Sequence, residues 1–153
     1  MKIAVLSDTH NLLRPEVIEI IKSSNAVIHG GDINSQGVLD EIKSVMKPNA
    51  QLFVIRGKND KEWAENMSVS LDFELGGLKF FLTHNRKDIP QDIKADIIIF
   101  GHSHKYCEEN IGGQLWLNPG SCGRKRFNLP ITMAVMNVND NEYSIEKIEL
   151  EGE

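Results

Sequence analysis

The most constraining feature of this sequence is an apolar run that stops abruptly at two histidines. Residues 97–100 are β-branched or aromatic throughout, a composition typical of a strand buried on both faces of a sheet. Gly101 then permits a tight departure from the strand, and His102 and His104 follow two positions apart. Their imidazoles can reach one point only if the backbone turns there. Taken alone, such a pair is more typical of a loop cap beside a solvated histidine than of a metal site, so the rest of the chain must decide.

The first third of the chain alternates apolar segments with segments of helical periodicity. The apolar segments 2–7, 26–29 and 52–55 predict three strands. Between them, residues 15–23 and 36–45 carry apolar side chains at the spacing of one helix face. Strands and helices in this alternation indicate parallel βαβ packing.

Beyond Asp60 the pattern changes to strands joined by short turns. We expect a helical turn over 61–66, at most a brief helix over 86–94, and then the strand 97–100. Three further pairs of strands flank turns that are typical of hairpins, namely 69–75 with 78–83, 106–110 with 114–117, and 131–137 with 142–150. Because no linker or internal repeat divides the 153 residues, we expect a single domain over 1–153.

Composition narrows the function classes. The 17 Lys and Arg against 22 Asp and Glu give a formal charge of −5, which disfavours nonspecific nucleic-acid binding. The apolar run near the amino terminus is too short for a secretory core or a membrane span, so we expect a cytoplasmic protein with no membrane partner. Cys107 and Cys122 have neither the density of a disulfide framework nor the spacing of a zinc knuckle, and are expected to be reduced packing thiols.

Polar side chains follow nearly every predicted strand at the point where it ends. In open α/β sheets the carboxyl ends of parallel strands share one edge, where ligands collect, so we expect these fragments to converge. Each fragment alone is explained by a cap, a turn or a polar strand end, but together they indicate a metal site. Oxygen and nitrogen donors without thiolates suit manganese, iron, nickel, cobalt or zinc better than calcium. The fragments are Asp8 and His10, Gly30 to Asp32, Gly57 to Asp60, His84, His102 and His104, and Asn118 to Ser121. His29 falls outside this set and is interpreted as structural.

In combination these motifs resemble the calcineurin-like metallophosphoesterases, in particular the small bacterial and archaeal phosphodiesterases of the YfcE and MJ0936 type. The shared pattern is Asp-x-His, Gly-Asp, Gly-Asn-x-Asp, Thr-His and Gly-His-x-His, and it spans nearly the whole chain. The resemblance implies an α/β fold, a four-layer α/β/β/α sandwich of two mixed sheets with divalent metal ions, manganese first among them, between the sheets. It also implies the ligand sets, which are Asp8, His10 and His104 for one metal, Asp32 as the bridge, and His84 with His102 for the second, with Asn118 to Ser121 at the border.

The resemblance further implies hydrolysis of phosphoesters, diesters above all, by a metal-bound hydroxide. A bridging carboxylate such as Asp32 can hold cations about 3.5–4 Å apart, and such a pair lowers the pKa of a shared water toward about 7. The cations also bind phosphoryl oxygens, so no Ser or Cys nucleophile is required. Asp32, His84 and His102 are therefore the expected catalytic residues, with Asn59 as a further candidate. Asp60 is expected either to orient His84 or His102, or to be an ordinary turn carboxylate.

One position departs from the family pattern. Lys58 stands where an asparagine carbonyl would meet the second metal, and a charged ammonium has no lone pair to offer. Three outcomes are open: Asn59 takes the ligand role, the second metal binds weakly, or Lys58 acts as a fixed cation that faces phosphate. We favour weak binding of the second metal, with Asn59 substitution next, and therefore expect one or two metal ions per chain.

The partners are predicted less directly. Arg124, Lys125 and Arg126 either grip nonbridging oxygens of a small phosphoester substrate or form a solvated basic loop. The exposed hairpins near the C-terminus could pair with a second subunit, which would make a homo-oligomer. The alternative function is a non-catalytic protein-binding scaffold, since a retromer subunit resembles these enzymes in fold. Every expected ligand position except Lys58 holds a residue able to bind metal, and this favours the enzyme.

Overall fold

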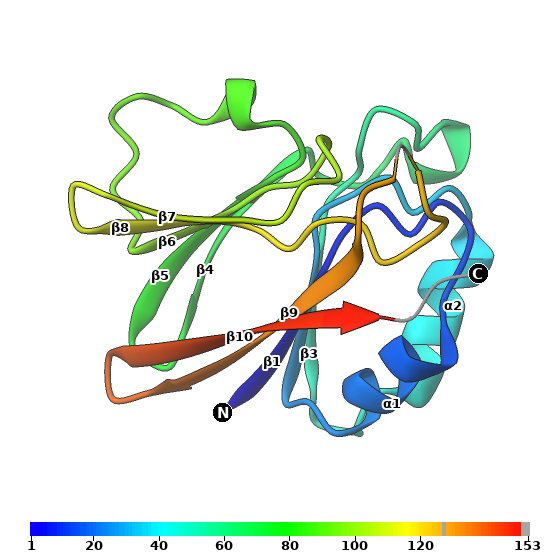
Figure 1. The fold of residues 1–153 in the computed structure, drawn as a ribbon, viewed down its shortest axis with the longest axis horizontal. Helices are drawn as coiled ribbons and strands as arrows, with labels where there is room; N and C mark the ends of the chain where they lie inside the picture. Colours follow the sequence, from blue (N-terminus) through cyan, green and yellow to red (C-terminus); the bar gives the residue numbers. More distant parts are fainter. Residues whose placement is uncertain (127, 151–153) are drawn as a thin grey trace.

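The computed structural model describes residues 1–126 and 128–150 and arranges them as two five-stranded sheets that face each other (Figure 1). The first sheet has the order β10-β9-β1-β2-β3, and the second has the order β4-β5-β6-β8-β7. The strands of the first sheet are β1 (Lys2–Leu6), β2 (Ala26–His29), β3 (Gln51–Val54), β9 (Ile131–Asn139) and β10 (Glu142–Leu150). Those of the second are β4 (Ser70–Leu75), β5 (Leu78–Thr83), β6 (Ile97–Ile99), β7 (Cys107–Ile111) and β8 (Gln114–Asn118). Both sheets mix parallel and antiparallel pairs, as predicted.

Two helices cover the outer face of the first sheet. Helix α1 (Pro15–Lys22) begins at a proline, whose fixed φ suits the first helical position, and buries Val17 and Ile21. Helix α2 (Gln36–Val45) is capped by the Ser35 side chain, which accepts a hydrogen bond from the Val38 N–H. It buries the apolar side chains of the helix face that the sequence predicted. No helix in the described residues is long and apolar enough to cross a membrane.

The outer face of the second sheet is covered differently. The predicted brief helix is a single 3-10 turn, η2 (Arg86–Asp88), followed by a loop whose Ile89 and Ala95 pack against Ile98. Pro90 interrupts this short polar segment and prevents a longer helix. The α/β class and the two mixed sheets are confirmed, while within the described residues the expected fourth layer consists of this turn and loop rather than an α-helix. A second 3-10 turn, η1 (Glu62–Ala64), occupies the predicted helical turn.

The main core lies between the two sheets. It is formed by alternate side chains of the strands, and the rings of Phe53, Phe73 and Phe80 stack across it with centroids 3.9 and 5.2 Å apart. This packing fixes the two sheets relative to each other. The parallel strands of each sheet consequently end at one edge, and Figure 1 shows the loops that follow β1, β2, β3 and β6 meeting in the upper right part of the view.

Candidate metal centre

Two groups of buried side chains at this edge have the composition and spacing of metal ligands. Asp8, His10 and His104 form the first group, and Asp8, Asp32 and His84 form the second. Within each group, one potential ligand atom per residue lies within 4.8 Å of the others. The five residues follow β1, β2, β5 and β6, so both sheets contribute, and the predicted convergence is observed. Asp8 belongs to both groups, whereas the family pattern predicts Asp32 as the residue shared by the two metals.

Asp8 is held at every polar atom except one. Its Oδ2 accepts hydrogen bonds from the Ser7 hydroxyl at 2.8 Å and from the His102 backbone N–H at 3.1 Å. Its carbonyl accepts from the Ser121 hydroxyl at 2.8 Å, and its N–H donates to the Gly31 carbonyl at 2.9 Å. The remaining oxygen, Oδ1, is buried and has no hydrogen-bond partner among the described residues. A buried carboxylate oxygen in this state is costly, and a bound cation would relieve that cost.

Three imidazole nitrogens face the free oxygen of Asp8. The Nε2 atoms of His104, His10 and His84 lie 3.5, 3.6 and 4.0 Å from Oδ1. Nε2 of His10 is also only 3.2 Å from Nε2 of His104. The Nδ1–H of His84 donates to the Gly30 carbonyl at 2.7 Å, and this orients Nε2 toward the carboxylates, as in metal-binding histidines. The buried oxygen and nitrogen donors therefore fit a divalent ion of the manganese-to-zinc series.

Asp32 and His84 form a close pair within the second group, with Oδ2 and Nε2 3.2 Å apart. Burial alone would lower the pKa of His84, but the contact with Asp32 and the charge of Asp8 outweigh it and raise that pKa to about 9. Burial would likewise raise the pKa of Asp32, but His84 and the Asn59 N–H hold it well below its usual range. The site thus favours positive charge at this point, and a metal ion held by His84 would take the place of its proton.

The backbone that presents these side chains is strained. Five of the six predicted ligands have a positive φ, which is 55° for Asp8, 45° for His10, 56° for Asp32, 77° for His102 and 64° for His104. Such a conformation costs a non-glycine residue on the order of 1 kcal/mol or more and persists only where the surroundings impose it. Here loop-to-loop hydrogen bonds impose it, for example from the His10 N–H to the Asp32 carbonyl at 3.0 Å. Strain of this kind clusters at functional sites, and no feature of the sequence revealed it.

His29 lies beneath the centre and takes no part in it. Its ring is fully buried, and burial lowers its pKa to about 4, so the imidazole is neutral. Nδ1 accepts a hydrogen bond from the Gly31 N–H at 3.1 Å, and Nε2 lies 3.1 Å from the Thr9 hydroxyl. The ring therefore joins the loop after β2 to the loop after β1, in agreement with the structural interpretation.

The loop after β3 contains Lys58, where the chain departs from the family pattern, and its neighbour Asn59. Asn59 donates to the Asp32 carboxylate through its backbone N–H at 2.8 Å and its side-chain amide at 3.2 Å. Lys58 is exposed and lines a pocket of about 430 Å³ together with Arg56, His84 and His102. Asn59 is thus in contact with the second ligand group, while Lys58 lies on the wall of the adjoining pocket.

Asp60 has a role that neither interpretation from the sequence anticipated. Its carboxylate is buried and accepts hydrogen bonds from the backbone N–H groups of Asp32, Asn34 and Gly57 at 2.9, 2.8 and 2.8 Å. It therefore neither orients a histidine nor forms a surface turn, and both interpretations are wrong. Asp60 ties the loops after β2 and β3 together directly beneath Asp32.

His102 stands apart from the other predicted ligands. Its side chain is exposed and belongs to neither ligand group, although its ring lies edge-on to that of His84 at 5.4 Å between centroids. What it contributes to the buried part is its backbone N–H, which binds Asp8.

Comparison with known proteins decides the family. Residues 1–141 match the family model described as the calcineurin-like phosphoesterase superfamily domain. The chain belongs to this superfamily. It is 32% identical to phosphodiesterase MJ0936 of Methanocaldococcus jannaschii, an alignment that covers 94% of this chain and 96% of that protein.

Solved structures have the same fold as this chain. A structure described as a novel archaeal phosphodiesterase superposes with a TM-score of 0.78 at 28% identity, and the match covers 98% of this chain and 100% of that one. Vps29 from Entamoeba histolytica, solved with Zn²⁺, superposes with a TM-score of 0.74 at 20% identity over 97% of this chain and 99% of its own. The Vps29 similarity shows the fold alone.

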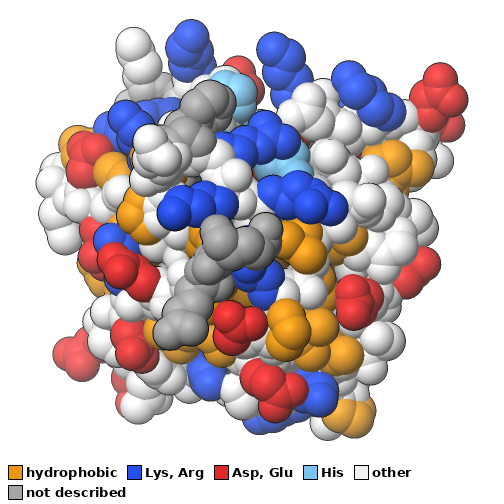
Figure 2. Space-filling view, turned by 45° about the vertical axis from the view of Figure 1, so that its right-hand side comes forward, with side chains coloured by type: hydrophobic (Ala, Val, Ile, Leu, Met, Phe, Trp, Pro, Cys, Tyr) orange, Lys and Arg blue, Asp and Glu red, His pale blue; other side chains and the backbone are white. Residues whose placement is uncertain are grey.

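The basic loop of this superfamily member, residues 124–126, lies at the rim of the centre. Arg124 and Arg126 are exposed and, with His104 and Ser121, border a narrow crevice. Burial lowers the pKa of His104, and His10 and Arg126 act in the same direction. Figure 2 shows Lys and Arg side chains around the two histidines visible on this face.

The sequence did not predict which side chains hold the centre in place. The hydroxyls of Ser7 and Ser121 both bind Asp8, yet only Ser121 lay within a motif. Arg14 is buried and donates to the Gly123 carbonyl at 2.9 and 3.2 Å, which fixes the base of the basic loop. A serine beside an aspartate and an arginine before a helix are too common to signal these roles.

Proposed function

We propose that this protein is a metal-dependent phosphoesterase that hydrolyses small phosphoesters, with phosphodiesters as its main class. The observation that carries the proposal is the buried Oδ1 of Asp8, which lacks a hydrogen-bond partner in the described residues and has three imidazole Nε2 atoms within 4.0 Å. The similarity to a phosphodiesterase over nearly the full length of both chains supports the same reaction.

The proposed ligands are those of the family pattern, and Asp8 is a second candidate, beside Asp32, for a ligand shared by both metals. Asp8, His10 and His104 would hold one metal, and Asp32, His84 and His102 the second. Asp32 is proposed as the bridge because its Oδ2 lies 3.2 Å from His84 Nε2 and 3.9 Å from His10 Nε2. Oδ1 of Asp8 is equally placed to be shared. Manganese is our first candidate, and nickel, iron, cobalt and zinc suit the same donors.

The chain's own residues prepare the site for phosphoryl transfer. Ser7 and the His102 N–H fix the Asp8 carboxylate, and Asn59 fixes that of Asp32, so little reorganisation is needed during reaction. When bound, divalent ions supply Lewis-acid stabilisation of phosphoryl oxygens and activate water for attack. Arg124 and Arg126, both exposed at the rim, are proposed to contact the nonbridging oxygens of the substrate.

The cysteines support a mechanism without a covalent intermediate. Burial raises the pKa of the Cys122 thiol to about 12 and that of Cys107 to about 11. Neither thiol is therefore ionised near neutral pH, and a thiol is a weak nucleophile in that form. Both cysteines are free, which supports a cytoplasmic location as part of this proposal. Pairing of two copies through the C-terminal hairpin stays a prediction.

A protein-binding scaffold is the second candidate function. Two observations favour it: the fold similarity to Vps29, and Lys58 at a position where the family pattern has a ligand. In this case the carboxylates and histidines would bind metal for structural reasons, and no turnover would accompany metal binding.

Hydrolysis of a chromogenic phosphodiester and of its monoester, measured before and after addition of manganese, separates the two functions. We expect metal-dependent release of the chromophore from the diester, loss of this activity in Asp8→Asn, and a reduction in His102→Ala. Lys47→Gln, an exposed change outside the centre, is the control and should retain full activity. Metal binding without turnover of either ester would leave the scaffold function ahead.

A further inference from the structure

The geometry points to a substrate that carries a second phosphate, held by a basic rim on the His104 side of the centre. This inference rests on the proposed phosphoesterase function and names the substrate class of that same site. We define the basic rim by three side chains, all of them exposed, namely Arg124, Lys125 and Arg126.

The basic rim concentrates positive charge on an acidic protein. The chain has a formal charge of −5, yet three cations line the crevice that also contains His104. Within residues 1–126 and 128–150, none of the three has a carboxylate oxygen within 4.0 Å, whereas Lys22, Arg86 and Lys147 do. Figure 2 shows Lys and Arg side chains around the histidines on this face. Unpaired cations next to a phosphoester site are suited to bind a further anion of the substrate.

The backbone beneath the basic rim is fixed relative to the centre. The Ser121 hydroxyl donates to the carbonyl of Asp8, and the Cys122 N–H donates to the carbonyl of Ser7. Gly123 lies so close to the backbone of Thr9 that a Cβ atom at this position would overlap the Thr9 carbonyl. The arginines therefore extend from an anchored segment beside the ligand Asp8, and the distance between the two anion sites is set by the fold.

The opposite side of the centre has a different character. The pocket of about 430 Å³ beside His84 and His102 contains the cations Arg56 and Lys58, but it also contains Asp88 and an apolar wall at Val69. Its mixed charge favours an uncharged, polar part of the substrate over a second anion. The two sides therefore predict an orientation, with the second phosphate on the basic rim and the neutral group in the pocket.

Two kinds of molecule supply the required chemistry. In a nucleotide ester the second phosphate is separated from the scissile one by a sugar, whereas in a polyphosphate the two share an oxygen. Guanidinium groups bind either of them through paired hydrogen bonds. The experiment therefore includes one probe of each kind.

The test compares chromogenic esters that differ only in the second phosphate. The reference is the p-nitrophenyl ester of thymidine 5′-monophosphate, and the probes are the same ester with a 3′-phosphate and the p-nitrophenyl ester of thymidine 5′-diphosphate. With manganese-loaded protein, we expect kcat/KM to be roughly tenfold or more higher for at least one probe, the usual size of a charge-assisted contact. The double variant Arg124→Gln with Arg126→Gln should reduce this ratio to near one.

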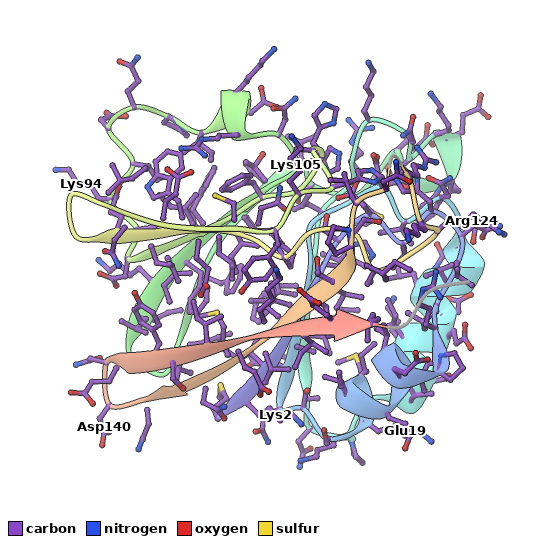
Figure 3. All side chains as sticks on the ribbon, in the orientation of Figure 1. Lys2, Glu19, Lys94, Lys105, Arg124 and Asp140 are labelled. Atoms are coloured by element: carbon purple, nitrogen blue, oxygen red, sulfur yellow. The ribbon has the colours of Figure 1, made fainter. Side chains whose placement is uncertain are left out.

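A matched control removes two charges elsewhere. Lys47→Gln with Lys94→Gln changes the net charge equally, and Figure 3 places Lys94 far from Arg124, so the ratio should be retained. As a measure independent of turnover, calorimetric titration should show tighter binding of thymidine 3′,5′-bisphosphate than of thymidine 5′-monophosphate if the sugar-spaced arrangement is correct. If the reference ester is hydrolysed and both probes have the same kcat/KM as the reference, the second-phosphate inference alone would be overturned. Absence of turnover with all esters would instead overturn the proposed function.

Discussion

The two sides of the candidate centre differ in how firmly the fold holds them. Asp8, His10 and His104 are buried, and Asp8 is bonded at every polar atom except the one that faces the histidines. Lys58 and His102 are exposed, and His102 is tied to the centre only through its backbone N–H. His102 and the buried His104 nevertheless belong to one motif, Gly-His-x-His. A recognisable motif therefore does not ensure that the fold holds each of its side chains firmly. We expect substitutions on the buried side to have larger effects than those on the exposed side.

The largest difference between the two sides is expected from Asp8→Asn compared with His102→Asn. Asp8→Asn removes the charge from a carboxylate that belongs to both ligand groups and weakens the anchoring of Ser7. We expect metal-dependent turnover to fall by roughly 10³-fold, whereas His102→Asn should cost about tenfold because its ring is exposed and outside the groups. Steady-state kinetics with elemental analysis of bound metal will measure both. Equal losses in the two variants would remove the distinction between the sides.

The buried side also depends on a neutral histidine beneath it. The pKa of His29 is lowered by burial from 6.5 to about 4, so between these values the unfolded chain binds a proton that the folded protein excludes. The stability that the neutral His29 contributes is therefore complete above pH 6.5 and falls as the pH decreases toward 4, by about 3 kcal/mol in total. In urea unfolding of metal-free protein, the change in stability between pH 7.5 and pH 4.5 should differ between wild type and His29→Gln by most of this amount, because the opposing contribution of His84 is common to both. His29→Gln should lack this component, and an unchanged pH dependence in that variant would contradict the assignment.

A smaller effect is expected where the two sides join, at Gly57. A Cβ atom there would overlap Oδ1 of Asp32 and lie 2.5 Å from its backbone nitrogen, so Gly57→Ala must displace a proposed ligand. We expect metal affinity to fall about 10-fold to 100-fold, the range seen when the support of a ligand is lost. The control is Gly112→Ala in the β7–β8 turn, where no atom lies within 4 Å and the strain comes instead from a positive φ of 56°. Gly112→Ala should reduce stability without changing metal affinity, and similar metal affinities in both variants would disprove the effect.

The sequence predicted the fold well because apolar periodicity and turn residues are local signals. The alternation of strands and helices before Asp60 and the glycine-rich hairpins after it were sufficient to anticipate two mixed sheets. The convergence of Asp8, His10 and His84 followed from the rule that parallel strands end at one edge. The left-handed turns and the three backbone bonds of Asp60 were not predictable, since they depend on loops from distant parts of the chain that meet only in the folded protein.

On the exposed side, replacing Lys58 with the asparagine of the family pattern tests how strongly the second metal binds. We expect elemental analysis of the wild-type protein, after equilibration with manganese, to give fewer than two metal ions per chain, because the ammonium offers no lone pair and adds a positive charge beside the second site. Lys58→Asn should raise the ratio toward two with only a modest change in turnover, since the first group contains no atom from this loop. Asn59 separates two explanations, because its amide already contacts Asp32 at 3.2 Å. If Asn59 has taken the ligand role, the wild type will hold two tight equivalents, Lys58→Asn will add nothing, and Asn59→Ala will lose one.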